Sequence, residues 1–504
     1  MAVKVIIVGA GAYGLSAGSY LAMNGFDVDI FEMNTMPGGV CTAWQRGGYT
    51  FDGCIHWLMG SSPGTRLHEL WRELHAVQGR RFVEWEEYVR IRTSSGEVLT
   101  VFTDPTRLER EMLRIAPDDS RAIRGLCSGI ARMSRLDFPV AMEKMTIRER
   151  IRALLALPSF GLAMARGASA SVETFCAGLK SRALAEALRC MYGLESAETG
   201  MADFPIAGLT MMLGFMHKKS NGYPIGGSLE FARAIERRFC ELGGTIHYGR
   251  RVDRILVEND QAVGIACGPE EHRADVVISC ADGHATLFGM LGGRYLGPSQ
   301  REAYDTYPVF PSLIYVGIGI EKDLRDKPSM TLFPLKKEIT LEDGALTLRR
   351  LGVRLFNFDP TMAPARKTAA TVMIATRNHA YWTSLREKEP EKYRCEKNRI
   401  GELVVRALDE ELGDIEGHVE VIDVATPATW IRCTGNWQGS YEGFLPTRKS
   451  LMKSPGFALP GLRRFYMSSQ WVSVGGGLPP AAMSGRALAR TICREFGRTF
   501  RALD

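Results

Sequence analysis

Apolar positions near the N-terminus follow the order strand, helix, strand. Residues 3–8 form an apolar run, interrupted only by Lys4, with many β-branched side chains, which is typical of a strand buried on both faces. A helix is predicted from the glycine loop that follows to about Asn24, with Gly25 as its C-cap. Residues 28–32 are predicted to form the next strand, so the chain starts with a strand–helix–strand unit.

The same alternation returns in the middle and at the end of the chain. One amphipathic helix and four strands are predicted in the middle, at residues 229–242, 245–248, 252–258, 262–267 and 275–279. A strand at 465–469 precedes a glycine loop and a helix from about Ala481, because Pro480 suits a first helical position. Arg/Glu-rich helical segments dominate residues 67–219, and residues 287–420 mix strands with helices.

These changes of pattern predict two interleaved domains. We expect a discontinuous Rossmann-like domain built from residues 1–66, 220–286 and 430–504. A second domain of mixed sheet and helices would come from residues 67–219 and 287–429. The predicted fold class is therefore α/β, or α+β when both domains are taken together.

Composition narrows the class of protein. With 504 residues, 45% hydrophobic and 24% charged, the chain can bury a large core, which excludes intrinsic disorder. The net charge of +6 is small, and no basic stripe interleaved with aromatics indicates a nucleic-acid partner. The eleven cysteines form no C-x-x-C pair and no Cys/His cluster with metal-ligand spacing. Their odd number favours a reducing compartment, so we expect a cytoplasmic protein without a metal site.

Membrane contact is predicted at one segment. The uncharged stretches 153–165, 204–217 and 306–320 each contain proline and are shorter than the roughly 18 residues of a spanning helix. Within residues 147–170, arginines flank leucine, phenylalanine and methionine side chains, which suits a peripheral helix lying in anionic lipid. The alternative is a pair of helices in the second domain, broken at Pro158.

Residues 9–14 match G-x-G-x-x-G between a predicted strand and a predicted helix. Gly9 permits the tight turn, Gly11 lets backbone approach a pyrophosphate, and Gly14 allows close helix–strand packing. Glu32 follows 18 residues after Gly14, where a carboxylate accepts ribose hydroxyls and repels a 2′-phosphate. An adenine dinucleotide other than NADP is therefore favoured; the alternative is an ordinary turn with Glu32 on the surface.

A second glycine motif precedes the C-terminal helix. Three consecutive glycines at 475–477, followed by Leu478, allow backbone to lie against a flat ligand. The helix start would direct its positive dipole end at that ligand, as suits the anionic edge of a reduced flavin. The alternative is a plain loop before a surface helix.

With these motifs, the chain resembles the FAD-dependent phytoene desaturase family, which also includes carotenoid cis–trans isomerases and retinol-saturase-like enzymes. The matching segments are residues 9–14 with Glu32, 38–39, 49–52, 226–228, 274–277, 434–443 and 470–479. They span both ends and the middle of the chain. They specify a flavoprotein far better than they specify a reaction.

The resemblance implies an extended FAD. Its pyrophosphate would lie at the first glycine motif, its ribose at Glu32, and its adenine against the backbone of Val252. The flavin ring would lie near Gly38, Gly39, Trp471, Gly476, Gly477 and Leu478. Gln470 departs from the family, because many related flavoproteins carry an acidic residue there. Its amide can hydrogen-bond the cofactor but cannot act as a base.

The loop around His56 should reach the face of the flavin. A histidine there could donate or accept a proton at neutral pH; the alternative is an imidazole merely hydrogen-bonded within the loop. Trp57 is predicted to form a wall of the substrate pocket, with Tyr441 and Glu442 as weaker pocket candidates.

The predicted function is that of an FAD-dependent oxidoreductase acting on a long apolar substrate, an isoprenoid or polyene. Desaturation or saturation would proceed by hydride transfer to or from flavin N5. The alternatives are a flavin-dependent cis–trans isomerase and an amine-oxidase-type flavoenzyme. A non-enzyme alternative is prenylated-protein binding of the Rab GDP-dissociation-inhibitor type, which has no need of an intact dinucleotide site.

Overall fold

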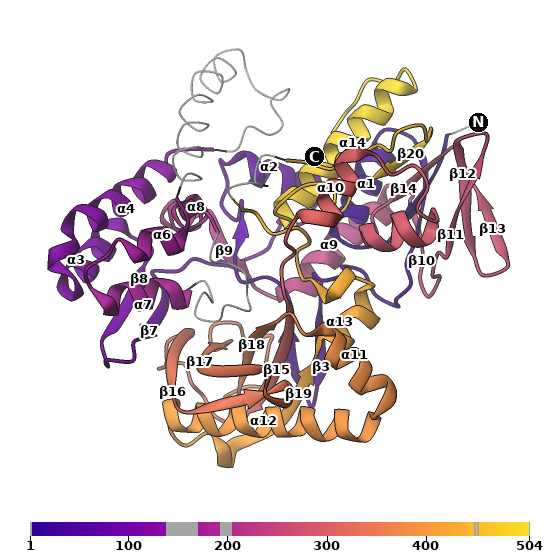
Figure 1. The fold of residues 1–504 in the computed structure, drawn as a ribbon. Coiled ribbons are helices and arrows are strands. Elements are labelled where there is room, and N and C mark those ends of the chain that lie inside the picture. Colours follow the sequence, from indigo (N-terminus) through magenta and orange to yellow (C-terminus); the bar gives the residue numbers. More distant parts are fainter. Residues whose placement is uncertain (1–2, 138–169, 192–203, 448–449, 451–452, 503–504) are drawn as a thin grey trace.

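The computed structural model describes residues 3–137, 170–191, 204–447, 450 and 453–502. Segment 147–170, for which membrane contact is predicted, lies outside the described residues except for Ala170. The described residues form a parallel sheet with helices, a larger mixed sheet, and a group of helices beside the larger sheet (Figure 1).

The parallel sheet gathers strands from the start, middle and end of the chain. Its order is β10 (Thr245–His247), β2 (Asp27–Phe31), β1 (Lys4–Val8), β14 (Val276–Ser279) and β20 (Phe465–Met467). Val5 and Ile7 of the central strand β1 are fully buried, as expected for a parallel strand covered on both faces. The predicted strand–helix–strand unit is therefore confirmed as β1, α1 (Ala12–Met23) and β2.

Helices α1, α9 (Gly227–Glu241) and α14 (Leu478–Glu495) pack together beside this sheet (Figure 1). Glycines set how closely they approach: a Cβ on Gly485 of α14 would lie 2.6 Å from the backbone nitrogen of Ala17 in α1. A Cβ on Gly18 would lie 2.9 Å from the ring of Phe239 in α9. The antiparallel strands β11 (Arg254–Glu258), β12 (Gln261–Cys267) and β13 (Glu270–Arg273) lie next to β14.

A buried ion pair fixes α14 to α2 (Arg66–Glu73). Nε of Arg486 donates to Oε2 of Glu73 at 2.9 Å, and the hydroxyl of Tyr20 in α1 donates to the same oxygen at 2.8 Å. The Glu73 side chain is 0% exposed and that of Arg486 8%. One carboxylate therefore joins three helices, α1, α2 and α14, that come from distant parts of the chain.

The larger sheet is mainly antiparallel. Its order is β19 (Val419–Ala425), β15 (Ser312–Ile320), β18 (Thr368–Thr376), β17 (Leu346–Leu355), β16 (Met330–Leu341), β7 (Glu87–Arg92) and β8 (Val98–Phe102). Helices α11 (His379–Lys388) and α12 (Pro390–Leu412) cover one side of it and bury Trp382 and Leu408 (Figure 1). Strands β16 and β7 pair in parallel, so two distant chain segments share this sheet.

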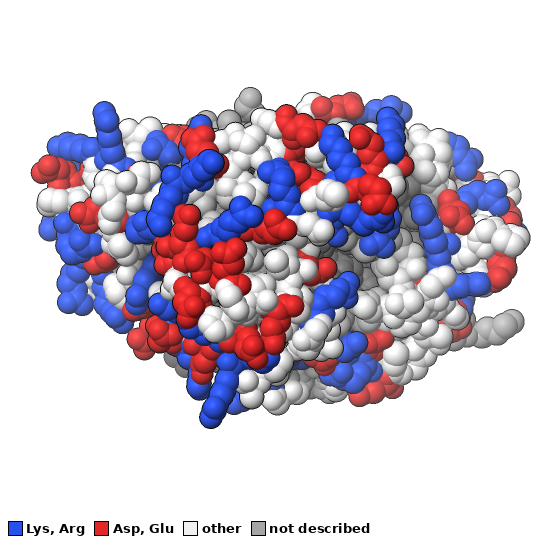
Figure 2. All heavy atoms as spheres, turned by 90° about the horizontal axis from the view of Figure 1, so that it is seen from below, with Lys and Arg blue, Asp and Glu red and all other residues white. Residues whose placement is uncertain are grey.

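Charges of both signs alternate over the outer side of the larger sheet. Figure 2 views the molecule from below Figure 1, the side on which α12 lies, and basic and acidic side chains are intermixed across it. Along α12, Arg399 pairs with Glu396 at 2.6 Å, and Arg406 pairs with Glu402 at 3.6 Å. Exposed pairs of this kind each contribute little, so stability comes mainly from the buried core.

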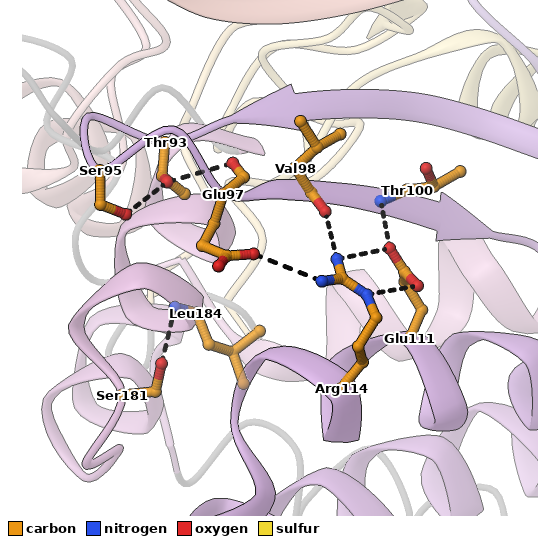
Figure 3. Close-up of polar contacts among 9 residues, drawn as sticks. All are labelled: Thr93, Ser95, Glu97, Val98, Thr100, Glu111, Arg114, Ser181 and Leu184. Atoms are coloured by element: carbon orange, nitrogen blue, oxygen red, sulfur yellow. Dashed lines mark hydrogen bonds and ion pairs between the residues drawn. The ribbon is translucent and has the colours of Figure 1, made fainter.

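A helical group lies at the β8 end of the larger sheet. It comprises α3 (Pro105–Ile115), α4 (Ser120–Met133), α6 (Val172–Ala177), α7 (Arg182–Met191) and α8 (Ile206–His217). Arg114 of α3 donates to the carbonyl of Val98 at 2.8 Å and pairs with Glu97 and Glu111, which ties α3 to β8 (Figure 3). Ser181 accepts the N–H of Leu184 at 3.2 Å and caps the first turn of α7 (Figure 3).

Short elements connect the two sheets. They are β3 (Ala43–Arg46), β4 (Tyr49–Asp52), β5 (Leu58–Met59), β6 (Phe82–Val83), β9 (Asn221–Pro224), α10 (Pro298–Thr306) and α13 (Pro427–Thr434). The β4 side chains Tyr49 and Phe51 pack directly on Gly319 and Gly317 of β15, where any Cβ would lie within 2.6 Å of a ring. The N-terminal segment is thereby fixed to the larger sheet.

One sequence expectation about an element is wrong. The C-terminal helix begins at Leu478 rather than near Ala481, with Gly477 at φ +107° as its N-cap. Both prolines lie in the first turn, where the helix has no partner for their missing N–H groups. Gly477 therefore ends the loop and opens the helix without an intervening residue.

Candidate active site

One cavity of about 1340 Å³ brings together nearly all the candidate residues. It exceeds the roughly 300–1,000 Å³ of an ordinary small-molecule site, so it has room for a cofactor and a substrate. The candidates that line it are Gly9, Gly11, Glu32, Gly38, Gly39, His56, Trp57, Val252, Tyr441, Glu442, Gln470, Trp471, Gly476, Gly477 and Leu478. Gly14 lies behind the lining, where its Cβ would be 1.9 Å from the carbonyl oxygen of Gly9.

The first glycine loop leaves backbone N–H groups open to the cavity. Gly9 has φ +98°, a conformation that favours glycine, and its N–H donates to the carbonyl of Phe31 at 2.8 Å. Gly11 is the N-cap of α1 and supplies no capping side chain. The free N–H groups and the dipole of this 12-residue helix make the loop suitable for a phosphate.

Glu32 braces the glycine loop from the next strand. Its Oε2 accepts the N–H of Ala10 at 2.7 Å, and its Oε1 accepts the N–H of Asn34 at 2.9 Å. The residue is only 6% exposed but lines the cavity. Oε1 also accepts the side-chain amide of Asn34 at 3.0 Å, whereas Oε2 keeps a further acceptor position, so Glu32 can hold the loop and still accept a ribose hydroxyl.

Two more glycine positions bring backbone to the cavity surface. Gly38 has φ +105°, and a Cβ there would lie 2.2 Å from the carbonyl oxygen of Cys41. In the C-terminal loop, a Cβ on Gly476 would lie 2.7 Å from the carbonyl oxygen of Glu442. A side chain fits at neither position, and a flat ligand can approach the main chain at both.

Three buried polar groups around the glycine loops lack a partner among the described residues: the hydroxyl of Tyr13, Nε2 of Gln470 and Nε1 of Trp471. Buried polar groups are nearly always hydrogen-bonded, so such a cluster in a cavity indicates a polar ligand. Tyr304 stacks behind Trp471 with ring centroids 6.1 Å apart and holds its indole in place. The donors and the glycine backbone together fit an extended dinucleotide.

His56 lies in the cavity wall as a neutral imidazole. Burial, together with the guanidinium of Arg354, lowers the pKa of His56 to about 3. Nη1 of Arg354 donates to the His56 carbonyl at 3.1 Å, which keeps that charge near the ring. His56 therefore holds no proton to donate as an imidazolium at neutral pH. Trp57 packs edge-on against Tyr88, with ring centroids 5.9 Å apart.

Two carboxyl groups in the wall have raised pKa values. Burial raises the pKa of Glu442 to about 7. Burial also raises the pKa of Asp282 to about 6, although its carboxylate accepts the N–H groups of Ala285 at 2.7 Å and Trp437 at 2.9 Å. Sequence reasoning missed Asp282. The available signal was its position three residues after β14, a buried strand of the parallel sheet.

Part of the cavity lining is apolar, and sequence reasoning missed this part as well; we call it the apolar arm. It is lined by Met59, Met191, Phe204, Met211, Met212, Leu313 and Met373. The signal was α8, whose residues are apolar on every side. Methionine side chains are flexible and polarisable, so they adapt to long apolar ligands of varied shape. None of the helices in the described part of the chain is long and apolar enough to cross a membrane.

Comparison with known proteins places this geometry in context. Residues 7–74 match the family described as NAD(P)-binding Rossmann-like domain. The chain is 22% identical over 514 residues to a 4,4'-diapophytoene desaturase (4,4'-diapolycopene-forming) of Methylomonas sp, covering 99% of this chain and 96% of the relative. It is 22% identical over 523 residues to the chloroplastic prolycopene isomerase of Arabidopsis thaliana, covering 99% and 84%. An oxidoreductase structure from Methanosarcina mazei aligns with a TM-score of 0.59 at 18% identity, over 96% of this chain and 99% of that one.

These similarities confirm the resemblance to the phytoene desaturase family predicted from the sequence motifs. The fold neighbour and the matched Rossmann-like domain confirm the predicted fold class. Together they support an oxidoreductase with a flavin-type cofactor and a lipophilic substrate. The domain boundaries and the roles of individual site residues stay predictions.

Proposed function

We propose that the chain is an FAD-dependent oxidoreductase that desaturates or saturates carbon–carbon bonds of a long polyene or isoprenoid. The observation that carries the proposal is the continuity of one cavity. The glycine motifs, with polar groups that lack a partner among the described residues, line the same cavity as the methionine, leucine and phenylalanine side chains of the apolar arm. Such a cavity holds a dinucleotide and an apolar chain end to end.

The first glycine loop would hold FAD by its pyrophosphate, with the N–H groups of α1 facing the phosphates. Glu32 would accept a ribose hydroxyl, and Val252 would contact the adenine. The ring would lie against Gly38, Gly39, Trp471, Gly476, Gly477 and Leu478, with Gln470 and Tyr13 donating hydrogen bonds. When bound, the flavin supplies an acceptor or donor of hydride.

The protein's own part is to place the substrate and exclude water. The apolar arm would hold the chain by dispersion and by removing apolar surface from water, at about 25 cal/mol per Å² buried. Its lining offers few hydrogen-bonding groups, so selection would depend on shape and length. The neutral His56 and the wall residue Trp57 would lie beside the reacting bond.

A cis–trans isomerase is the second candidate. It is favoured by the similarity to prolycopene isomerase, which extends over 99% of this chain. The same cavity would serve both reactions, because each places a polyene against a flavin. We rank the redox reaction first, since the desaturase relative covers the chain equally and is matched over 96% of its own length.

The proposal includes the interleaved organisation expected from the sequence. Residues 1–66, 220–286 and 430–504 would form the FAD-binding domain, and residues 67–219 and 287–429 the substrate-binding domain. Peripheral membrane contact through segment 147–170, and a cytoplasmic location, belong to the same proposal. A bilayer surface would deliver a substrate too apolar for free diffusion in water.

The test is a product analysis with purified protein. Holoprotein is incubated with candidate polyenes, once with oxidised and once with reduced flavin, and the products are analysed by chromatography and mass spectrometry. Loss of two hydrogens indicates a desaturase, gain of two a saturase, and unchanged mass with altered retention an isomerase. A protein that cannot take up FAD would refute the proposal, as would release of ammonia and peroxide from an amine.

A further inference from the structure

Glu442 lines the cavity, and the main chain next to it is held in place. The main chain on its C-terminal side is fixed on two elements: the N–H of Phe310 donates to the Gly443 carbonyl at 2.8 Å, and that of Gly475 donates to the Phe444 carbonyl at 3.0 Å. A Cβ on Gly477 would lie 3.0 Å from Oε1 of Glu442. The carboxyl therefore lies against the N-cap of α14, where the proposed flavin ring binds.

Among the residues that the structure describes, no neighbour neutralises this carboxyl. Burial is the cause of its raised pKa, and among the described residues no hydrogen bond to the carboxyl offsets that effect. Within the described part of the chain, the titratable groups that interact with it are Tyr13 of α1 and Tyr441, and burial raises the pKa of both phenols far above neutral. Cys280 interacts with the phenol of Tyr13, and Arg377 interacts with the phenol of Tyr441.

Three other acid or base groups of the described cavity wall, His56, Glu32 and Asp282, differ from Glu442. His56 loses its proton at a pKa of about 3. The oxygens of Glu32 and Asp282 already accept backbone N–H groups. Among the described lining residues, Glu442 combines a carboxyl free of such bonds with a pKa of about 7.

We propose that Glu442 is the proton-exchanging group of the cavity and takes up one proton each time the bound flavin is reduced. The inference rests on the proposed function. In a desaturation, one substrate hydrogen leaves with its electron pair to the flavin, and its neighbour leaves as a proton to the Glu442 carboxylate. The electrons of the second C–H bond form the new double bond, and saturation reverses each transfer.

Reduction by a hydride equivalent leaves a negative charge on the flavin, which raises the affinity of the adjacent carboxylate for a proton. Above pH 7, reduction of the holoprotein should therefore take up two protons per two electrons instead of one. The equilibrium constant for reduction then falls a hundredfold per pH unit, which lowers the midpoint potential of the flavin by about 59 mV. Uptake of one proton would give a tenfold fall, or about 30 mV per pH unit.

The experiment is a redox titration of holoprotein with dithionite and reference dyes between about pH 7.5 and 9. Wild type and the control Glu416→Gln, an exposed residue outside the cavity, should show the steep slope. Glu442→Gln should show the shallow slope, and Glu442→Asp should restore the steep one. A shallow slope in wild type, or a steep slope in Glu442→Gln, would overturn the inference.

A measurement on wild type alone covers the case in which both Glu442 variants lose flavin. The infrared difference spectrum on reduction should gain a protonated-carboxyl band that shifts in D₂O, and absence of this band counts against the inference. Failure of wild type to bind flavin would instead remove the proposed function itself.

Discussion

Replacing Glu73 by alanine should destabilise the parallel-sheet half of the molecule strongly. Glu73 is fully buried, and its loss removes the carboxylate that pairs with the guanidinium of Arg486, which is 8% exposed. Breaking a buried pair in this way costs about 3–5 kcal/mol, because the remaining charge stays desolvated. The hydroxyl of Tyr20 also loses its acceptor, which adds about 1 kcal/mol.

The assay is guanidinium unfolding followed by intrinsic fluorescence, with apo-protein at neutral pH. The matched control is Glu87→Gln, which breaks an exposed pair with Arg90 and should change stability by less than about 1 kcal/mol. The double variant Glu73→Leu/Arg486→Met should recover most of the loss, since no buried charge remains. A loss below about 1 kcal/mol in Glu73→Ala, or no recovery in the double variant, would refute the reasoning.

Four further predictions concern the cavity. Gly11→Val should abolish retention of flavin, read as yellow absorbance, while circular dichroism stays unchanged. Burial raises the pKa of the Glu442 carboxyl from 4.5 to about 7 in the folded state, so its ionisation opposes folding. Glu442→Gln should therefore stabilise apo-protein at pH 8 by at most about 3 kcal/mol and have no effect below about pH 4.5. Equal unfolding midpoints of the two proteins at pH 8 would contradict this. Met211→Gln should lower kcat/KM for a polyene about 10- to 200-fold without changing flavin content. His56→Gln should leave the shape of the pH–rate profile unchanged between pH 5 and 8, since the imidazole is already neutral there; loss of an inflection would show that His56 titrates.

Local signals made part of the site predictable. Gly9, Gly11 and Gly14 are constrained by a turn, a helix start and a strand contact that lie within a few residues of one another. Glu32 follows at a fixed distance because one helix separates two adjacent strands. These are short-range consequences of a βαβ unit, which is why sequence spacing could reveal them.

Long-range effects could not be predicted. The neutral state of His56 depends on burial and on Arg354, 298 residues away in the chain. The pair of Glu73 with Arg486 joins positions 413 residues apart, and neither side chain is distinguishable in sequence from a surface charge. Strand β16 was not identified either, because Lys336, Lys337 and Glu338 interrupt its apolar alternation.

The order of strands in the parallel sheet determines when this sheet can be completed during synthesis. Strand β20 forms one edge of the sheet and pairs with β14, almost 190 residues earlier in the chain. Until residues 465–467 emerge from the ribosome, β14 presents an unpaired edge that can recruit foreign strands. Pairings of such long range also close slowly, since loop entropy is lost before contacts form. Strand β20 and α14 therefore complete both the sheet and the wall of the cavity, so a nascent chain can acquire a full cofactor site only after these two elements have been synthesised.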